Sequence, residues 1–502
     1  MRGSVEAATL AMGGRVVAGD GAARWSGAAI DSRRLAGGEL FFALPGEHTD
    51  GHRYVAAAAA MGAAACVVHH DLDPPAGTAL IRVDDTAEAL RELARALRRG
   101  TEGRPPRPAA IAAITGSTGK TTTKELAAAM LSRRYRTARS EGNLNNLLGF
   151  PLSLLNAPDD TEWLVAEMGM SAAGELARLT ALARPELVIY TNVRPVHLEF
   201  FDSVRAIAEA KAELLEGLVP GGLVVANADD PEVSRFVERF AAARTAAGEP
   251  VRVVWYGRRD PRAAVRATDV AAAGGGEVGT RFTLTVVADG DGGSAQTVAP
   301  EAGTVEVRLP LHGDYNVDNA LAAAAAAVAL GVPLGDLAAA AVAIRAVSGR
   351  GAIHRLAGGV TIVDDSYNSN PEALKLALDS AAGLPGERRW AVLGDMLELG
   401  PEEAAFHRAA GRHAVERGFV PVYAVGELSR EIAAGAAEAG GAGRWFATAE
   451  EAVGAVVDEI AEGDVLLVKA SRGVGLDRIV ERLLAATPVG AGGAEGDAGG
   501  EA

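Results

Sequence analysis

Residues 114–126, ITGSTGKTTTKEL, bring together residue types that hold a nucleotide phosphate. The two glycines let backbone N–H groups converge on an anion, the lysine can span the β- and γ-phosphates, and the threonine after it can ligate Mg²⁺. The loop is shorter than the usual P-loop, because Ile114 stands where a glycine is expected. A threonine-rich turn is the alternative, but Gly-Lys-Thr between a predicted strand and helix favours a phosphate site. The predicted ATP contacts here are Thr115, Gly116, Ser117, Thr118, Gly119, Lys120, Thr121 and Thr122.

Lysine is rare in this chain and therefore informative where it occurs. Only five of the 49 lysine and arginine residues are lysines, which leaves 44 arginines. Arginine cannot replace a lysine that must act as a compact ammonium or a nucleophilic amine. We expect Lys120, Lys211 and Lys469 to serve in functional sites. We leave Lys124 and Lys375 open, since a surviving lysine can also be an accidental surface residue.

The elements around the loop alternate between strand and helix. The apolar run AAIAAIT enters the glycine loop, and TTTKELAAAMLSRRY follows with helical periodicity. WLVAEMG, PELVIYTNV and GGLVVANADD are further short apolar runs separated by helix-like segments. This order predicts a parallel sheet with helices on both faces. Residues 251–311 are strand-like at VRVVWYG, TRFTLTVVA and TVEVRLPL, which predicts an antiparallel addition to that sheet.

The length of 502 residues predicts several folding units rather than one core. The proline-rich segment TEGRPPRP, residues 101–108, is typical of a linker. We expect an α/β protein of three domains: a smaller N-terminal α/β domain at 1–104, a central P-loop domain at 105–346, and a C-terminal Rossmann-like α/β domain at 347–486. The Gly-rich tail 487–502 has nothing to bury and is expected to be disordered.

Composition excludes several functional classes. The formal net charge of −16 argues against nonspecific nucleic-acid binding, which needs a basic surface. No run of eighteen apolar residues predicts a membrane span, and the N-terminus is a poor secretory signal, so we expect a cytoplasmic protein. The single cysteine, Cys66, excludes an internal disulfide and is expected to pack in a core.

The pattern T-G-x-x-G-K-T followed by EGNLNNLLGFPLSLL resembles the Mur ligases, the ATP-dependent amino-acid-adding enzymes of peptidoglycan synthesis. The resemblance covers nearly the whole chain. It continues through AEMGM, TNVRPVHLEFFDSVRAIAEAKAEL with Asn192, NADDP, GDYNVDNALAA and GRGAIHRLAGGVTIVDDSYNSNP. Each segment alone is weak, but their order and spacing together are specific.

The resemblance implies a metal site and two Mg²⁺ ions. Thr121 and Glu167 match magnesium ligands, His197 matches the ligand of a second magnesium, and Lys211 matches a lysine carried as a carbamate. We take Lys120, Glu167, His197 and Lys211 as the catalytic set. The alternatives are a packed loop histidine for His197, and for Lys211 an exposed helical lysine paired with a glutamate.

The resemblance also implies nucleotide contacts outside the glycine loop. Asn319 is expected at the adenine edge, although the family often has histidine where this chain has Tyr315. Asn316 belongs to the same set, with helix capping as the alternative. Arg350 is preferred to Arg355 as the arginine that contacts the nucleotide. Asp365 completes the expected ATP contacts.

The segment DDSYNSNP, residues 364–371, resembles the branch of the family that adds D-alanyl-D-alanine to UDP-N-acetylmuramoyl-tripeptide. LGDMLELG followed by His407 fits the same branch, and no Asn-Pro-Arg motif of the diaminopimelate-adding or lysine-adding branch is found. For the C-terminal segments the alternative is that they are ordinary loops at strand ends. For Asp31 the alternative is that it caps a turn. The expected substrate contacts are Asp31, Ser32, Arg33, Asp50, Asn143, Asn145, Asn146, Tyr367, Asn368, Asn370, Lys469, Ser471 and Arg472.

The expected reaction is ATP-dependent, ADP-forming amide ligation through an acyl phosphate, with UDP-MurNAc-tripeptide and D-Ala-D-Ala as substrates and transient contacts with other cell-wall enzymes. Another Mur-type or folylpolyglutamate-type ligase is the closest alternative. A noncatalytic nucleotide-binding scaffold is the alternative from another class.

Overall fold

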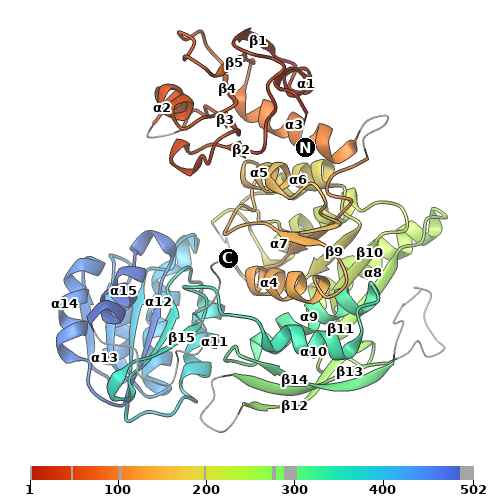
Figure 1. The fold of residues 1–502 in the computed structure, drawn as a ribbon. Helices are drawn as coiled ribbons and strands as arrows, with labels where there is room; N and C mark the ends of the chain where they lie inside the picture. Colours follow the sequence, from red (N-terminus) through yellow and green to blue (C-terminus); the bar gives the residue numbers. More distant parts are fainter. Residues whose placement is uncertain are drawn as a thin grey trace, which may run out of the picture.

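The computed structural model describes residues 3–46, 49–100, 105–196, 199–273, 279–287 and 302–486. These residues form three separate β-sheets that follow one another along the chain (Figure 1). The α/β fold class with three domains is therefore confirmed. The boundaries at 104 and 346 stay predictions, and the expected disorder of 487–502 falls outside the described residues. No described helix is both long and apolar enough to cross a bilayer.

The N-terminal sheet has five strands in the order β1-β5-β4-β3-β2, of which only β1 runs antiparallel to its neighbour. Cys66 on β4 is fully buried, as expected, and burial raises the pKa of its thiol to about 12. The elements are α1 (Val5–Ala11), β1 (Arg15–Ala18), β2 (Ala28–Ala29), η1 (Ser32–Arg34), β3 (Leu40–Phe42), η2 (Gly51–Tyr54), α2 (Val55–Ala60), β4 (Ala65–Val68), β5 (Ala79–Arg82) and α3 (Thr86–Arg99).

The central sheet has nine strands in the order β14-β13-β12-β11-β10-β9-β6-β8-β7. Its first elements are β6 (Ala110–Thr115), α4 (Lys120–Leu131), β7 (Thr137–Arg139), α5 (Gly149–Asn156), β8 (Trp163–Glu167), α6 (Glu175–Ala183), β9 (Leu187–Tyr190), α7 (Val204–Ala212) and η3 (Glu213–Gly217). The remaining ones are β10 (Leu223–Asn227), α8 (Pro231–Ala246), β11 (Arg252–Gly257), β12 (Val265–Ala272), β13 (Thr280–Val286), β14 (Gly303–Leu309), α9 (Tyr315–Ala329) and α10 (Leu334–Val342).

Alternate side chains of the central strands enter two different cores. Ile111 and Ala113 of β6 pack in the core that also holds α5 and α6, whereas Ala112 and Ile114 pack against α4, α9 and α10. A strand buried on both faces needs apolar residues at successive positions, which is why AAIAAIT is a continuous run. The predicted parallel sheet with helices on both faces is confirmed (Figure 1).

The prediction for residues 251–311 is partly wrong. β11, the VRVVWYG segment, pairs parallel with β10, and β12 pairs parallel with β11. The antiparallel pairs are β12 with β13 and β13 with β14. The nearly continuous burial of β11 is typical of a parallel strand covered on both faces. β12 was missed because its sequence, VRATDVAA, mixes polar and apolar residues and only part of it is buried.

The C-terminal sheet has six strands in the order β15-β16-β20-β17-β18-β19, and only β15 is antiparallel. Apolar cores on both of its faces give the expected Rossmann-like layering. Its elements are β15 (Ala352–Arg355), η4 (Ala357–Gly359), β16 (Thr361–Asp365), α11 (Pro371–Ala381), β17 (Arg388–Gly394), η5 (Gly400–Glu402), α12 (Glu403–Glu416), β18 (Phe419–Val425), α13 (Arg430–Glu438), β19 (Gly443–Phe446), α14 (Ala449–Glu459), β20 (Asp464–Lys469), η6 (Arg472–Val474) and α15 (Asp477–Ala486).

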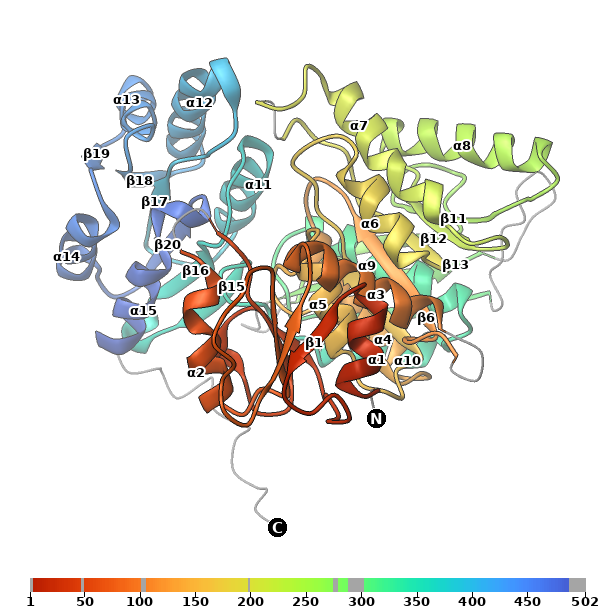
Figure 2. The ribbon, with the colours of Figure 1, turned by 90° about the horizontal axis from the view of Figure 1, so that it is seen from above.

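The N-terminal domain lies directly on α5 and α6 of the central domain, as both views of the ribbon show (Figures 1 and 2). One continuous apolar core joins them, since it includes Leu90 and Leu93 of α3 together with Leu155 and Leu179. Asn156 adds a polar contact. Its side-chain amide accepts a hydrogen bond from Ala28 N at 2.8 Å and donates one to Ala28 O at 2.9 Å.

Candidate active site

The phosphate loop connects β6 to α4 and requires its glycines. Gly119 has φ +82° and immediately precedes α4, and Gly116 has φ +154°. A Cβ atom on Gly119 would lie 2.1 Å from Asn319 Oδ1, and one on Gly116 would lie 1.9 Å from Thr191 Oγ1. Both positions therefore exclude a side chain. The first helical hydrogen bond of α4 runs from Thr123 N to Gly119 O, so earlier N–H groups at the helix start can serve an anion.

The loop is held by the residues that follow β9. Ser117 N donates to Asn192 O at 2.9 Å, and Thr118 N donates to Asn192 Oδ1 at 3.0 Å. Thr191 Oγ1 donates to Thr118 O at 2.6 Å. The resemblance marked Asn192 only as part of a motif, and Thr191 was missed. The signal was present in the sequence, because β9 ends beside β6 in a parallel sheet and a polar Thr-Asn pair follows it.

Lys120 begins α4 and folds back over the loop. Its Nζ donates to Gly116 O at 2.7 Å and lies 3.3 Å from Ser117 O. Burial lowers the pKa of this ammonium, the negative charge of Glu167 opposes that shift, and the positive charge of Arg350 adds to it. The structure therefore brings the predicted arginine of the C-terminal domain into the electrostatic environment of the loop lysine.

Glu167 ends β8 and offers oxygen ligands beside the loop. It is 3% exposed, and its two carboxylate oxygens accept hydrogen bonds from Thr121 Oγ1 at 2.8 Å and Asn145 Nδ2 at 2.9 Å. Both of these donors are neutral groups. Because burying an unpaired charge is costly, a cation bound beside Glu167 would stabilise its ionised carboxylate. Carboxylate, hydroxyl and amide oxygens are ligands that Mg²⁺ accepts, so these residues fit the expected metal.

Lys124, which the sequence left open, supports this carboxylate. Its side chain is 1% exposed, and its Nζ donates to Ser140 O at 2.7 Å and approaches Gly142 O at 3.3 Å. Ser140 Oγ in turn accepts a hydrogen bond from Glu167 N at 3.2 Å. Lys124 therefore ties α4 to the segment that leads from β7 into the Asn-rich loop. Lys375, by contrast, is an exposed residue paired with Asp379.

Lys211 lies at the end of α7 and is 3% exposed, so the alternative of an exposed helical lysine is wrong. Burial lowers the pKa of its amine well below the usual value, and the positive charge of Lys120 lowers it further. Among the described residues no ion pair or hydrogen bond reaches its Nζ. Tyr190 OH holds its backbone carbonyl at 3.0 Å. The fourth residue of the predicted catalytic set, His197, lies outside the described residues.

Asn316 and Asn319 lie inside α9 and are both buried. Asp314 precedes the helix, so the capping alternative for Asn316 is wrong; its Nδ2 instead donates to His312 O at 2.8 Å. Asn319 packs against Gly119 and bonds Asn316 Oδ1 through its own Nδ2 at 3.2 Å. The structure thus places Asn319 on the phosphate loop itself, while its contact with adenine stays a prediction.

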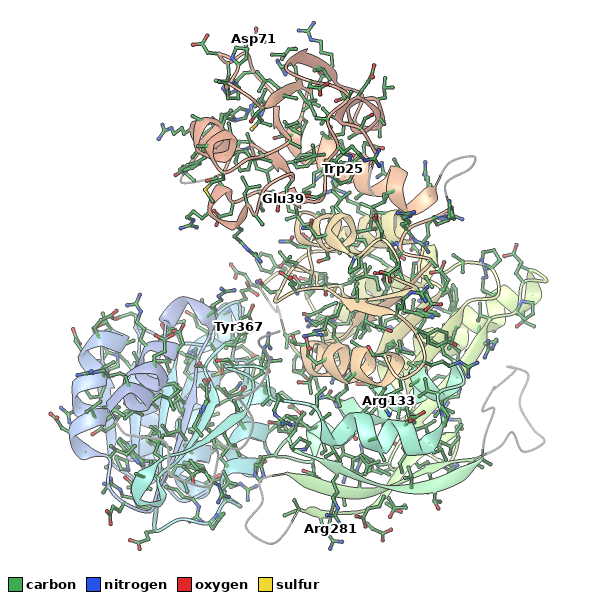
Figure 3. The ribbon with its side chains drawn as sticks, in the orientation of Figure 1. Trp25, Glu39, Asp71, Arg133, Arg281 and Tyr367 are labelled. Atoms are coloured by element: carbon green, nitrogen blue, oxygen red, sulfur yellow. The ribbon has the colours of Figure 1, made fainter. Side chains whose placement is uncertain are left out.

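A second group of predicted residues gathers where β16 and β20 end. Lys469 Nζ bonds Asp365 Oδ2 at 2.5 Å and Asn368 O at 2.8 Å. Tyr367 lies between two arginines: the guanidinium of Arg350 is 4.0 Å from its ring centroid and that of Arg472 is 5.1 Å away. In Figure 3 Tyr367 stands at the margin of the C-terminal domain that faces the central one.

Arg355, the alternative to Arg350, lies at the opposite end of the sheet. It pairs with Thr361 at the start of β16, whereas Asp365 marks the end of that strand. It is also exposed. The geometry therefore favours Arg350.

Several other predicted residues have structural partners. Asn370 caps α11 through Ala373 N at 2.9 Å, and Ser471 Oγ accepts from Leu397 N at 3.1 Å. Asn368 is exposed. His407 is fully buried, and its ring bonds Met396 N and Glu403 O, which fixes the LGDMLELG loop.

The N-terminal candidates lie in two short turns away from the phosphate loop. Asp31 caps η1 through Arg33 N at 3.0 Å and also bonds the Arg33 guanidinium, which holds the pKa of the carboxyl below its usual value. Ser32 is buried, and Asp50 caps η2 through His52 N at 3.0 Å. The turn-cap alternative is thus observed for Asp31, and substrate contact stays a prediction.

The turn η1 nevertheless reaches the central domain. Arg34 Nη2 pairs with Glu141 Oε2 at 3.0 Å, immediately before the Asn-rich loop. Within that loop Asn145 bonds Glu167, and Asn146 Oδ1 accepts from Gly149 N at 2.8 Å at the start of α5. Asn143 contributes its carbonyl to Asn145 N at 2.7 Å. One loop therefore links the N-terminal turn to the carboxylate beside the phosphate loop.

Comparison with known proteins gives matches over the whole architecture. The model of the Mur ligase middle domain matches residues 114–327, that of the Mur ligase glutamate ligase domain matches 349–472, and that of the Mur ligase family catalytic domain matches 25–98. UDP-N-acetylmuramoyl-tripeptide--D-alanyl-D-alanine ligase from Escherichia coli K12 is 35% identical over 455 residues, covering 90% of this chain and 92% of the relative. The enzyme of the same name from Bacillus subtilis 168 is 33% identical over 462 residues, covering 91% and 93%.

Solved structures agree with these sequence matches. A crystal structure of MurF from Acinetobacter baumannii superposes with a TM-score of 0.79 at 28% identity and covers 96% of this chain and 99% of its own. MurF ligase from Thermotoga maritima in complex with ADP gives 0.71 at 26% identity, with 92% and 97% covered. With family models matching all three domains and relatives at least 33% identical over nine-tenths of its length, the chain belongs to the Mur ligase family.

Proposed function

We propose that the chain is an ATP-dependent, ADP-forming ligase that joins D-alanyl-D-alanine to UDP-N-acetylmuramoyl-tripeptide. The observation that carries this proposal is the buried group formed by the loop lysine, Glu167, Thr121 and Lys211 at the end of the central strands. The relatives that carry the name of this activity match more than nine-tenths of their own length. These four residues support the use of ATP, and the names of the relatives indicate the two substrates.

The reaction must first activate a carboxylate. A carboxylate repels electron pairs and has no good leaving group, so an amine cannot displace oxide from it. Transfer of the γ-phosphoryl group of ATP to the terminal carboxylate of the tripeptide gives an acyl phosphate. The free amine of D-Ala-D-Ala then attacks the acyl carbon, and inorganic phosphate leaves from the tetrahedral intermediate. Catalysis of this kind depends on positioning and on stabilising the charge of the phosphoryl group.

The residues of the central domain divide this work. The N–H groups at the start of α4 and the ammonium of Lys120 bind the phosphates. Thr121 and Glu167 would hold a Mg²⁺ ion, which neutralises phosphate charge when bound. Arg350 lies close enough to affect Lys120 and contacts the nucleotide from the C-terminal domain.

Lys211 is proposed to act as a carbamate. Carbon dioxide adds to a neutral primary amine, and burial favours the neutral form here. The product is an anion that can ligate a second Mg²⁺ together with His197. The low pKa, the burial and the absence of a described polar partner for Nζ support this assignment.

The test is ADP release by the purified chain with ATP, Mg²⁺, UDP-MurNAc-tripeptide and one amine at a time. Release that requires D-Ala-D-Ala supports the proposal, and mass spectrometry should show the pentapeptide product. Release with diaminopimelate, lysine or glutamate in place of the dipeptide would favour another Mur-type or folylpolyglutamate-type ligase. ATP binding without turnover on any amine would favour a noncatalytic scaffold.

The proposed substrates also suggest a cellular setting. ATP and UDP-linked sugars are cytoplasmic compounds, so we place the reaction in the cytoplasm as a step of the cell-wall synthesis that growth and division require. Transient contacts with other cell-wall enzymes belong to this proposal.

A further inference from the structure

The rings of three histidines lie close together in the N-terminal domain, outside the phosphate loop. His52 lies in η2, and His69 and His70 directly follow β4. The ring centroids of His52 and His70 are 3.9 Å apart in a stacked arrangement, and those of His52 and His69 are 4.3 Å apart at a steep angle. One nitrogen of each ring lies within 4.8 Å of the corresponding nitrogens of the other two. This group, His52, His69 and His70, is called the histidine cluster below.

Asp50 orients the buried member of the cluster. His52 Nδ1 lies 2.6 Å from Asp50 Oδ1, and His52 Nε2 accepts a hydrogen bond from His69 N at 3.1 Å. The carboxylate therefore selects the tautomer with the proton on Nδ1 and the lone pair on Nε2, which faces the other two histidines. A carboxylate behind a histidine is the usual support of a metal-binding imidazole. Burial also lowers the pKa of His52 and favours the neutral ring that a metal requires.

The other two rings have unused nitrogens. His69 and His70 are half-buried, and among the described residues no hydrogen bond or ion pair involves their ring nitrogens. The charged residues nearest in the chain are Arg53, Asp50 and Asp71, and Asp71 pairs with Arg82 at 3.6 Å. A divalent ion would therefore meet three neutral donors, with Asp50 as the carboxylate in contact with the cluster.

The three ring nitrogens lie close enough to share a transition metal once the rings reorient. Three atoms no more than 4.8 Å apart lie within about 2.8 Å of a common centre, and zinc binds imidazole nitrogen at about 2.0–2.1 Å. Closing this gap requires side-chain rotations that also unstack His70 from His52, because a metal lies in the plane of each ring that binds it, and it costs the His69 N to His52 Nε2 hydrogen bond. Imidazole suits zinc and its neighbours, whereas Mg²⁺ prefers oxygen ligands.

We propose that the histidine cluster binds one divalent transition-metal ion of the zinc class, at a site separate from the magnesium ligands of the central domain. Its three protein ligands leave a fourth position for water or for a ligand group. Because Asp50 and Thr49 belong to the same turn, the bound ion also fixes the conformation of a segment predicted to contact the UDP-linked substrate.

Titration of the full-length, tag-free chain with Co²⁺ and with Zn²⁺ tests the site. Co²⁺ should produce visible d–d absorption that saturates at one ion per chain in the presence of excess Mg²⁺, and Zn²⁺ should displace it. His69→Ala and His70→Ala should each abolish this saturable signal. Asp50→Asn should weaken the affinity by about tenfold or more, because it removes the support of His52 without removing a ligand.

His413→Gln is the matched control, since this half-buried histidine lies on α12 in the C-terminal domain. It should bind Co²⁺ as the parent chain does. No saturable signal in the parent chain, or a signal that survives in both His69→Ala and His70→Ala, would overturn the proposal. Circular dichroism spectra of His69→Ala and His70→Ala should equal that of the parent chain. This comparison distinguishes loss of the metal site from loss of the fold. Neither result depends on ligase activity, so the site and the proposed function can fail separately.

Discussion

The structure explains why four of the five lysines are lysines and not arginines. Lys120, Lys124, Lys211 and Lys469 are buried or half-buried, and three of them donate to backbone carbonyls. A compact ammonium fits between such acceptors where a planar guanidinium does not. Lys124 shows the limit of this signal, because the sequence could not distinguish its role from that of Lys375, and only the structure shows that Lys124 is buried and Lys375 exposed.

Lys124→Met should impair the metal site more than the fold. Loss of the contacts with Ser140 O and Gly142 O frees the segment that positions Glu167 and Asn145, so we expect a severalfold higher Mg²⁺ concentration for half-maximal ADP release. Lys124→Arg should not restore the parent value, because the buried Nζ lies among Ser140 O, Gly142 O and Glu125, a set that suits a compact ammonium better than a planar guanidinium. The measurement is the Mg²⁺ dependence of the initial rate at saturating ATP.

Lys375→Met is the control for this experiment, since it removes an exposed lysine with a single ion pair. Its Mg²⁺ dependence should equal that of the parent. A Lys124→Met variant with an unchanged Mg²⁺ requirement, but a lower melting temperature, would show that the lysine serves stability alone.

Carbamate formation at Lys211 should extend to unusually low pH. A lysine with an ordinary pKa is protonated at neutral pH, but burial and Lys120 lower the pKa of Lys211, so its neutral amine persists there and is lost only as the pH falls through the lowered value. With ¹³C-bicarbonate, NMR should show a carbamate resonance near pH 7.5 that fades on acidification.

Lys211→Arg should lack this resonance and lose ligase activity, since a guanidinium does not form the carbamate under these conditions. Retention of full activity by Lys211→Arg would contradict the carbamate assignment without affecting the assignment of the phosphate loop.

At the level of elements, the junction of β6 and α4 is the most constrained part of the site. Gly119→Ala places a Cβ against Asn319 Oδ1 and in a conformation with φ +82° that costs an alanine about 1–2 kcal/mol. We expect ATP affinity to fall by an order of magnitude or more, because the N–H groups at the start of α4 shift with the loop. Calorimetric titration with ATP measures this effect.

Gly335→Ala provides the matched control in a helix that does not touch the loop. No atom lies within 4 Å of the added Cβ, and the change should leave ATP binding intact and stability unchanged or raised by less than about 1 kcal/mol. If Gly119→Ala bound ATP as tightly as Gly335→Ala, the loop geometry described above would not control binding.

The sequence predicted this junction and the alternation of strands and helices because both depend on local signals. It predicted neither the direction of β11 nor the existence of β12, since a strand pairs according to neighbours that lie elsewhere in the chain. It also missed Thr191 and Ser140. A threonine or serine at a strand end has no distinctive spacing, and only the parallel sheet brings each of them beside the loop or Glu167.

At the scale of the whole molecule, the two outer domains are attached differently. The N-terminal domain shares an apolar core with α5 and α6, whereas contacts from the central to the C-terminal domain include isolated polar ones such as His312 Nε2 with Ser380 O at 2.8 Å. The way the outer domains attach to the central domain could not be predicted from the sequence, because each contact joins residues that are distant in the chain.

Asn156→Leu should weaken binding of the UDP-linked substrate but not of ATP. The substitution removes both hydrogen bonds to Ala28, which position β2 and the turn η1 over the Asn-rich loop. We expect a loss of about tenfold in affinity for UDP-MurNAc-tripeptide, corresponding to about 1.4 kcal/mol for two lost hydrogen bonds. Parallel calorimetric titrations with the two ligands distinguish this outcome from general destabilisation, which would affect both.

Because four of the five lysine side chains are buried or half-buried, few amines of this protein are accessible to amine-reactive reagents. All five lysines lie in the described part of the chain, and Lys375 on α11 is the one whose side chain is exposed. Among the lysines, a dye ester should therefore attach mainly to this one, on the C-terminal domain. A fluorophore at that position would report movement of this domain during turnover without any cysteine having to be introduced.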